Sequence, residues 1–448
     1  MTPNHITRAQ SLVAQALVFG ALLAAAACNP NKALDVDDVD VVSPGQLNDK
    51  SSLPTLRNGV LSTFQLAFSG GADLANGGHE GQATMSGLLG DEFLNAESFP
   101  DRISVDQRDI IPSNLSLVAL FLDLSRARAT ADFVSSQYTL LDPGAIGQSE
   151  VLSIGGFSYI LFGENYCSGV PFSTLDKNNN IVYGDPQTRD QVLQIAVAKF
   201  DSAITIATQE GDADLLQLAQ VGKARALLDL GRFADAATAA TPVATSFEYL
   251  VRSSSNSLRQ NNGIWNYTAN TFAFSVPDRE GGNGLNYLSA RDPRLQVVAT
   301  GQRGFDRATP FNLQLKYPDL QSDVVLASGT EARLIQAEAA LRAGTPGPAF
   351  TILNALRALD GLAPLTDPGS DVARVNLLFR ERAFWMWGTA HRLGDMRRLV
   401  RQYSRAQNTV FPSGEYHKGG QYGTDVNFPV SSDERNNPKF TGCIDRAA

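Results

Sequence analysis

The sequence predicts a mainly α-helical protein, a tetratricopeptide-like helical bundle with an inserted loop-rich region that contains a few short strands. Apolar residues recur at helical spacing along most of the chain, which predicts amphipathic helices. Two helix–turn–helix patterns lie on either side of residues 245–328. Those intervening residues lack the helical pattern and are rich in glycine, serine, asparagine and aromatic residues, which favours short strands and long loops.

The first half of the chain is predicted to form a series of helices. Apolar residues in each segment lie near one stripe, as Leu56, Val60 and Phe64 do in the first. Ser113 or Asn114 is expected to cap the second helix. The predicted helices cover residues 53–68, 114–138, a stretch within 145–162, 188–208 and 213–230.

The two helix–turn–helix patterns have the residue spacing of tetratricopeptide units. In each unit a glycine ends the first helix with a left-handed cap, and an alanine lets the second helix pack closely. Because Gly231 and Gly344 are 113 residues apart, the units are not in tandem. We therefore predict helical hairpins over about 114–243 and 330–401, with an insert over about 245–328. The residues that fit the spacing are Ala224, Leu227, Gly231, Phe233 and Ala236, and then Ala337, Ala340, Gly344 and Ala349.

Residues 1–27 have the pattern of a signal peptide, with a polar start that contains Arg8, an apolar run and small residues at the end. The apolar run is too short for a comfortable transmembrane helix. Ala25–Ala27 and the following Cys28 resemble the cleavage site of bacterial lipoproteins, in which this cysteine carries fatty acyl chains such as palmitate. The alternative is an ordinary signal peptide. Residues 28–45 are then expected to form an acidic tether that holds the protein to a membrane.

The mature chain is acidic and poor in histidine and cysteine. Removal of Arg8 with the signal peptide changes the net charge from −9 to −10, which argues against binding of nucleic acid. Because the whole chain has four histidines, we expect no metal site, and no motif indicates a cofactor. No phosphate loop, nucleophile elbow or HExxH helix is present, so we expect no enzyme. Cys167 and Cys443 could form a disulfide or remain buried thiols.

Residues 371–401 contain the most informative pattern in the chain. An Arg/Glu-rich helix runs into an aromatic stretch, a His-Arg turn and Asp-Met-Arg-Arg. This pattern resembles the closing signature of the SusD/RagB family of outer-membrane nutrient-binding lipoproteins. Thr389 and Ala390 depart from it, since the family usually has an acidic or polar residue followed by glycine. The matching positions are Arg380, Glu381, Arg382, Phe384, Trp385, His391, Arg392, Asp395, Met396, Arg397 and Arg398.

Further landmarks of the same family follow in the same order along the chain. They extend the resemblance over the whole mature protein and predict a single SusD-like domain over residues 46–448. The landmarks are Leu34–Val36, Gly90–Phe93, Tyr166–Phe172, the repeat at 331–359, Phe428–Val430 and Asn436–Pro438.

The charged residues of the signature also have a physical interpretation. We expect the arginines and carboxylates to form a buried or half-buried ion network that holds the C-terminal helix on the bundle, because arginine binds carboxylates in a bidentate way. This structural role is favoured over catalysis. Trp385 and Trp387 are expected in the core or at an interface. The network residues are Glu381, Arg382, Arg392, Asp395, Arg397 and Arg398.

The resemblance implies a protein anchored to the outer face of the outer membrane, where it captures a nutrient, most often an oligosaccharide and in some branches a peptide. Such a protein delivers the ligand to a SusC-like TonB-dependent barrel transporter and acts as its lid. Sugar capture uses aromatic faces and a few polar groups in a concave site. The candidate ligand-binding residues are Trp265, Tyr267, Tyr287, His79, Asn95 and Phe99.

Two alternatives belong to other functional classes. A helical-repeat scaffold at the cell envelope would bind only protein and would have an exposed apolar groove on the repeats, without a ligand pocket. A secreted glycosidase would need two carboxylates across a substrate, and Asp91 and Glu92 are the candidates.

Overall fold

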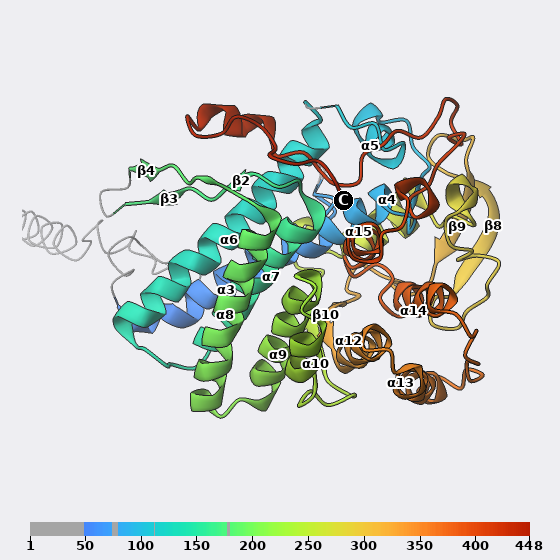
Figure 1. The fold of residues 1–448 in the computed structure, drawn as a ribbon. Helices are drawn as coiled ribbons and strands as arrows, with labels where there is room; N and C mark the ends of the chain where they lie inside the picture. Colours follow the sequence, from blue (N-terminus) through green and yellow to red (C-terminus); the bar gives the residue numbers. More distant parts are fainter. Residues whose placement is uncertain (1–48, 74–78, 112, 177–179) are drawn as a thin grey trace, which may run out of the picture. The chain divides into compact units, whose positions relative to one another are not determined.

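The computed structural model describes residues 49–73, 79–111, 113–176 and 180–448, and the predicted signal peptide, Cys28 and the tether lie outside these residues. Residues 49–448 form one folded unit. Helices dominate its described part, and the strands there are short (Figure 1). The predicted mainly α-helical fold class is therefore confirmed. No helix of the described part is long and apolar enough to cross a membrane.

Long helices from the first half of the chain pack side by side (Figure 1). The innermost is α7 (Gln148–Asn165), whose eighteen residues are all buried. A Cβ atom on Gly156 of α7 or on Gly222 would lie 2.7 or 2.2 Å from the ring of Phe200, so both glycines make room for this ring. The other members of the layer are α3 (Leu53–Ser69), α6 (Leu115–Leu141) and α8 (Arg189–Glu210).

Two helical hairpins, one around Gly231 and one around Gly344, stack on each other in space. Gly231 and Gly344 have φ angles of 75° and 74°, which is the left-handed conformation expected at a helix end. Although the two units are far apart in sequence, α10 packs directly against α12. The helices concerned are α9 (Ala213–Asp229), α10 (Phe233–Ala240), α12 (Gly329–Arg342), α13 (Pro346–Leu359), α14 (Asp371–Trp385) and α15 (Arg392–Tyr403).

The insert leaves the stacked helices and returns to them through one antiparallel strand pair. Strand β6 (Glu248–Val251) pairs with β10 (Val324–Ser328), so that both ends of the insert are joined next to the helices. Strand β8 (Val297–Arg303) pairs with β9 (Pro310–Gln314) in a hairpin within the insert. The short strands predicted for this region are therefore confirmed. It also contains α11 (Gly263–Trp265), the π-helix η4 (Asn266–Asn270) and β7 (Phe274–Ser275).

Two α-helices and several short strands outside the insert were not predicted. Helix α4 (Gln82–Leu89) is buried on every side, so that it has no apolar stripe for a periodicity argument to detect. Helix α5 (Pro100–Asp106) is only seven residues long. The strand pairs are β1 (Leu94–Asn95) with β7, β2 (Val170–Pro171) with β5 (Pro186–Gln187), and β3 (Thr174–Leu175) with β4 (Ile181–Val182).

A disulfide joins Cys167 to Cys443 across a sequence separation of 276 residues. Beside it, Cys167 donates a backbone hydrogen bond to Phe428 and Ser168 donates one to Asp445. The disulfide therefore fastens the C-terminal segment to the end of α7.

Replacing both cysteines of this disulfide by alanine is expected to lower the free energy of unfolding by about 2–4 kcal/mol, because the cross-link restricts the unfolded chain. Urea unfolding followed by circular dichroism measures the change. Wild-type protein treated with a reductant should show the same loss, and equal midpoints for oxidised and reduced wild type would contradict this expectation.

Candidate functional site

The C-terminal signature forms a buried ion cluster rather than a surface site. Arg382 on α14 binds both oxygens of Asp395 on α15, with Nε–Oδ2 and Nη2–Oδ1 distances of 2.7 and 2.9 Å. Arg398 donates to Asp395 Oδ1 at 2.7 Å and forms an ion pair with Glu338 of α12. Burial alone would raise the pKa of Asp395, but Arg382 and Arg398 hold this pKa below its usual range.

The remaining signature residues connect α14 and α15 to distant parts of the chain. Arg392 binds Asp91 at 2.6 and 2.8 Å. Glu381 accepts from Arg294 of the insert and from Arg357 of α13, at 2.6 and 2.7 Å. His391 Nε2 lies 3.0 Å from Glu331 Oε1, and Arg397 donates to backbone carbonyls at the end of α7. These contacts join the two helices to segments that are far from them in the sequence.

Asp91 and Glu92, the two carboxylates that a glycosidase would need, both lie in the interior. Asp91 is buried and engaged by Arg392, while Glu92 is buried and accepts the backbone N–H of Gly388 at 3.0 Å. Burial raises the pKa of Glu92 to about 8. Neither carboxyl group reaches the surface, so this pair has no access to a glycosidic bond in this conformation.

In the turn between α14 and α15, an alanine occupies a backbone conformation that favours glycine. Ala390 has a φ of 58°, in the left-handed region that glycine adopts at low cost and where the family usually has glycine. Ala390→Gly is therefore expected to raise the free energy of unfolding by up to about 1 kcal/mol. Chemical denaturation measures this, and a clear loss of stability would show that the alanine methyl group contributes more through packing.

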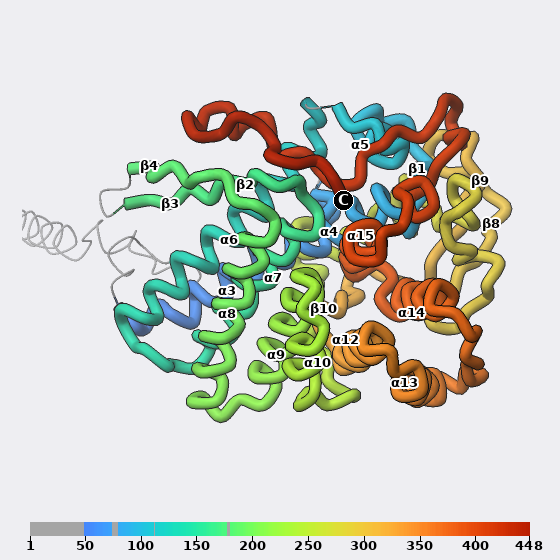
Figure 2. Tube along the Cα trace, viewed as in Figure 1, coloured from blue at the N-terminus to red at the C-terminus, as the bar shows by residue number. Residues whose placement is uncertain are grey.

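Two exposed phenylalanines form an aromatic pair at the surface. Phe99 and Phe305 are 53% and 55% exposed, and their ring centroids lie 6.2 Å apart with an interplanar angle of 29°. Phe99 precedes α5, and Phe305 lies in the turn of the β8–β9 hairpin. Figure 2 shows β1, β8 and β9 on the same side of the molecule. We call these two residues the aromatic pair.

Backbone contacts fix the turn that carries Phe305. Phe305 N–H donates to the carbonyl oxygen of Phe272 at 3.0 Å, and Asp306 N–H donates to that of Ala96 at 2.9 Å. A Cβ atom on Gly304 would lie 2.4 Å from the Ala96 Cβ, so only glycine permits this close approach. The turn is therefore docked on residues that lie just before Phe99 and at the end of η4.

A buried charged side chain, Arg102, packs against the inner side of the aromatic pair. The Arg102 guanidinium carbon lies 5.3 Å from the Phe99 ring centroid and 4.8 Å from that of Tyr267, so that Arg102 lies between the two rings. Arg102 Nη1 lies 3.0 Å from both oxygens of Glu97, and its Nε donates to Glu80 at 2.8 Å. Burial raises the pKa of Glu97 to about 7, although Arg102 opposes this.

A second support comes from the C-terminal loop. Lys418 Nζ donates to the Glu97 carbonyl oxygen at 2.9 Å and forms an ion pair with Asp306. Asp306 Oδ1 also accepts the backbone N–H groups of Ala308 and Thr309, each at 2.8 Å. Partial burial would raise the pKa of Asp306, but the hydrogen bonds from Lys418 and Thr309 hold it below its usual range. The loop thus clamps the turn to the segment around Phe99.

A cavity of about 450 Å³ opens beside Phe305. Its lining combines two aromatic rings, two arginines and polar groups, and none of the lining residues is acidic. The lining residues are Thr271, Phe272, Gln302, Arg303, Gly304, Phe305 and Arg307. The aromatic pair and this cavity together are the candidate binding site. Flat apolar faces beside a few polar groups are the usual form of a sugar-binding site.

The fold agrees with a group of solved structures. No protein-family model and no curated protein sequence matches the chain. A SusD-like carbohydrate-binding protein of Bacteroides vulgatus superposes with a TM-score of 0.62 at 15% identity, over 87% of this chain and 97% of that one. A SusD-like protein of Bacteroides fragilis gives 0.63 at 13% identity, over 90% and 98%.

The fold is that of the SusD-like proteins. A further match is the surface glycan-binding protein A of Bacteroides thetaiotaomicron, in a complex with laminarihexaose, with a TM-score of 0.65 at 13% identity over 87% of this chain and 99% of that one. The SusD-like fold expected from the signature is thus present, and the matches span nearly the full length of these proteins.

Within this SusD-like fold, the candidate residues from the sequence have different positions. Phe99 belongs to the aromatic pair. Tyr267 is 1% exposed and lies below Arg102, while Asn95 is buried and its side chain accepts the Glu97 N–H at 3.1 Å. Tyr287 is fully buried, with its ring 5.3 Å from that of Phe384. In this conformation these three side chains support the fold and offer no face to a ligand.

Two other candidates are only partly buried. The Trp265 side chain is half-buried, and its backbone N–H is capped by Asn262. His79 Nδ1 lies 2.7 Å from Asp123 Oδ2, and this contact raises the pKa of His79 against the effect of burial. No ring contact or hydrogen bond found in the described ranges links either residue to the aromatic pair. Their role in binding stays a prediction.

Three residues at the cavity, Phe305, Arg303 and Arg307, were not among the candidates from the sequence. A glycine followed by an aromatic residue and an aspartate, between two short alternating segments, was the available signal for a hairpin turn that presents an aromatic ring.

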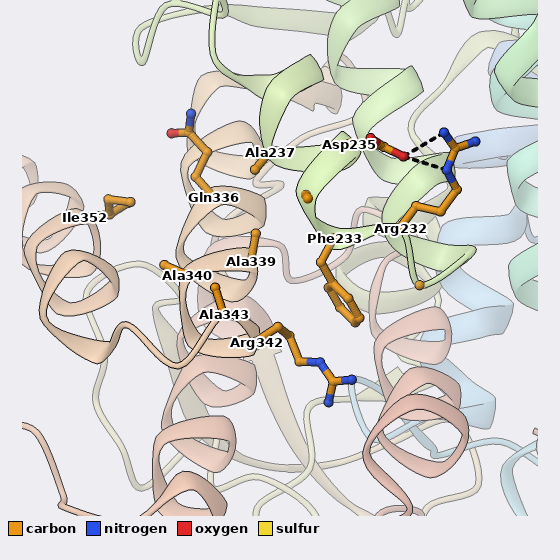
Figure 3. A pocket seen from close by; sticks show the side chains of 12 residues that line it. Arg232, Phe233, Asp235, Ala237, Gln336, Ala339, Ala340, Arg342, Ala343 and Ile352 are labelled. Atoms are coloured by element: carbon orange, nitrogen blue, oxygen red, sulfur yellow. Dashed lines mark hydrogen bonds and ion pairs between the residues drawn. The ribbon is translucent and has the colours of Figure 1, made fainter.

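A larger groove of about 810 Å³ lies between the stacked hairpins (Figure 3). Half of its lining residues are alanine or glycine, among them Ala237, Ala340 and Ala343. The Arg342 guanidinium carbon lies 4.7 Å from the Phe233 ring centroid at one side. An exposed, mostly apolar groove on the repeats is the feature expected of a protein-binding scaffold.

Proposed function

We propose that this protein is a surface-exposed outer-membrane lipoprotein of the SusD/RagB family that captures an oligosaccharide and delivers it to a partner TonB-dependent transporter, acting as its lid. The exposed aromatic pair beside the cavity is the observation that carries this proposal. The similar folds of a SusD-like carbohydrate-binding protein and of a surface glycan-binding protein support it.

The physical argument begins with the exposure of the two rings. Half of each ring faces water although the described chain buries most of its other phenylalanines. A sugar ring that covers them removes apolar surface from water at about 25 cal/mol per Å². The turn and the supporting ion pairs hold both rings in place before a ligand arrives, so little conformational entropy is lost on binding.

The proposed location rests on the N-terminal sequence and the disulfide. Acylation of Cys28 would anchor the chain, and the disulfide agrees with an exported protein, because disulfides persist in oxidising compartments. Loss of palmitate labelling in Cys28→Ala would support the anchor, whereas labelling retained in this variant would contradict it.

Binding without chemistry is the expected behaviour of the site. Isothermal titration calorimetry of the mature protein against oligosaccharides and peptides tests capture, and analysis of the recovered sugar tests whether it is unchanged. Saturable binding of an intact oligosaccharide supports the proposal. Reducing sugar released in step with protein concentration would show that the protein is a hydrolase.

A protein-binding scaffold is the second candidate, and the groove of Figure 3 favours it. Ligand binding distinguishes the scaffold from the proposed nutrient-binding protein. A scaffold would co-purify with a large barrel protein and bind no glycan or peptide, whereas the proposed protein would do both.

A further inference from the structure

Two arginines lie on either side of Phe305 in the hairpin turn. Arg303 and Arg307 line the cavity beside this ring, and both are exposed. Neither makes an ion pair within the described ranges, whereas Arg102, which lies under Phe99, pairs with Glu80 and Glu97. Both guanidinium groups are therefore available to a ligand that touches Phe305.

The backbone of the turn determines where the two arginines lie. Arg303 Nη1 donates to the Ala308 carbonyl oxygen at 2.8 Å, so that its side chain is held along the turn. Arg307 has a φ of 59°, and its N–H donates to the Gly304 carbonyl oxygen at 2.9 Å. The turn that positions the aromatic ring thus also places two cationic groups at the same cavity.

The carboxylates near the cavity form ion pairs with other side chains and not with Arg303 or Arg307. Asp306 is occupied by Lys418 and Thr309, and Glu80 and Glu97 are occupied by Arg102. The residues that line the cavity therefore carry two positive charges and no negative charge. This is the opposite of the whole chain, whose net charge is −9. A local excess of positive charge on an acidic protein attracts anions to that place.

We propose that the site takes an anionic oligosaccharide, whose rings carry carboxylate or sulfate groups. Phe305 and Phe99 bind the apolar faces of the sugar rings, while Arg303 and Arg307 bind the charged substituents. This inference rests on the proposed function and adds the ligand class. Guanidinium groups suit the task because they bind carboxylate or sulfate oxygens through two parallel hydrogen bonds.

Calorimetry with three hexasaccharide probes tests the proposal: an oligogalacturonate, a sulfated oligosaccharide and neutral laminarihexaose. At least one anionic probe is expected to bind about tenfold or more tighter than the neutral probe, which corresponds to about 1.4 kcal/mol. Its affinity should fall as salt is added, since both arginines are exposed. The two anionic probes distinguish carboxylate from sulfate as the charged group.

Variants assign the effect to the two arginines. The double variant Arg303→Gln/Arg307→Gln should lose about tenfold or more in affinity for the anionic probe and little for the neutral one. Arg291→Gln is the matched control, because Arg291 is also exposed, lies in the insert and has a φ of 50°, but does not line the cavity. Unfolding midpoints equal to that of the wild type show that each variant is folded.

The possible failures can be told apart. If the neutral probe binds as tightly as both anionic ones, the ligand class is wrong and the proposed capture of oligosaccharides stands. An equal loss for neutral and anionic probes in the double variant also overturns the ligand class. If neither anionic nor neutral probes bind, both this inference and oligosaccharide capture fail.

Discussion

Asp395→Ala is expected to lower the free energy of unfolding by about 3–5 kcal/mol, because it breaks a buried ion cluster. Asp395 accepts from Arg382 and Arg398, and all three side chains are buried. Without it, two guanidinium groups remain in the interior with less compensation for their lost hydration. Guanidinium chloride unfolding followed by circular dichroism measures the change.

An exposed ion pair provides the control for this variant. Asp201 on α8 pairs with Lys223 on α9 and its side chain is 52% exposed, so Asp201→Ala should change stability by less than about 1 kcal/mol. If the two variants lose the same amount, the cluster would be no more important than a surface pair, and the structural role assigned to the signature would be wrong.

The double variant Phe99→Ala/Phe305→Ala is expected to bind oligosaccharide at least about a hundredfold more weakly than the wild type. Covering about 100 Å² of each ring contributes about 2.5 kcal/mol, and the two contributions together exceed a hundredfold in affinity. Because both rings are half exposed, their removal leaves the core intact. Calorimetry with the tightest probe gives the loss.

Phe133 supplies the matched control, since it is 44% exposed and lies on α6, away from the cavity lining. Phe133→Ala should bind like the wild type. Retention of full affinity by the double variant, with a normal unfolding midpoint, would show that the ligand binds elsewhere.

The helical part of the fold could be predicted because its signals are local. Gly231 and Gly344 end helices with the left-handed cap that their spacing indicates, and Asn114 caps α6 through the N–H of Leu117. Arg382 and Asp395 are close in sequence and on adjoining helices, so their pairing could also be anticipated. Helix α4 had no stripe to detect, because all of its faces are buried.

The candidate site could be predicted only in part, because its geometry depends on contacts between distant segments. Phe99 was a candidate from the sequence, but Phe305, the other member of the aromatic pair, is placed by backbone hydrogen bonds to Ala96 and Phe272. Tyr267 is covered in part by Arg102, which comes from another segment and lies over its ring. Aromatic composition alone does not distinguish a ring that supports the site from one that faces the ligand.

The structure of the protein with a bound oligosaccharide is the most direct test of capture at the aromatic pair. The expected result is an intact sugar chain with one ring within about 4 Å of the Phe305 ring and a charged substituent at Arg303 or Arg307. A sugar bound in the groove of Figure 3, or against Trp265 with the aromatic pair uncovered, would contradict the site proposed for this protein.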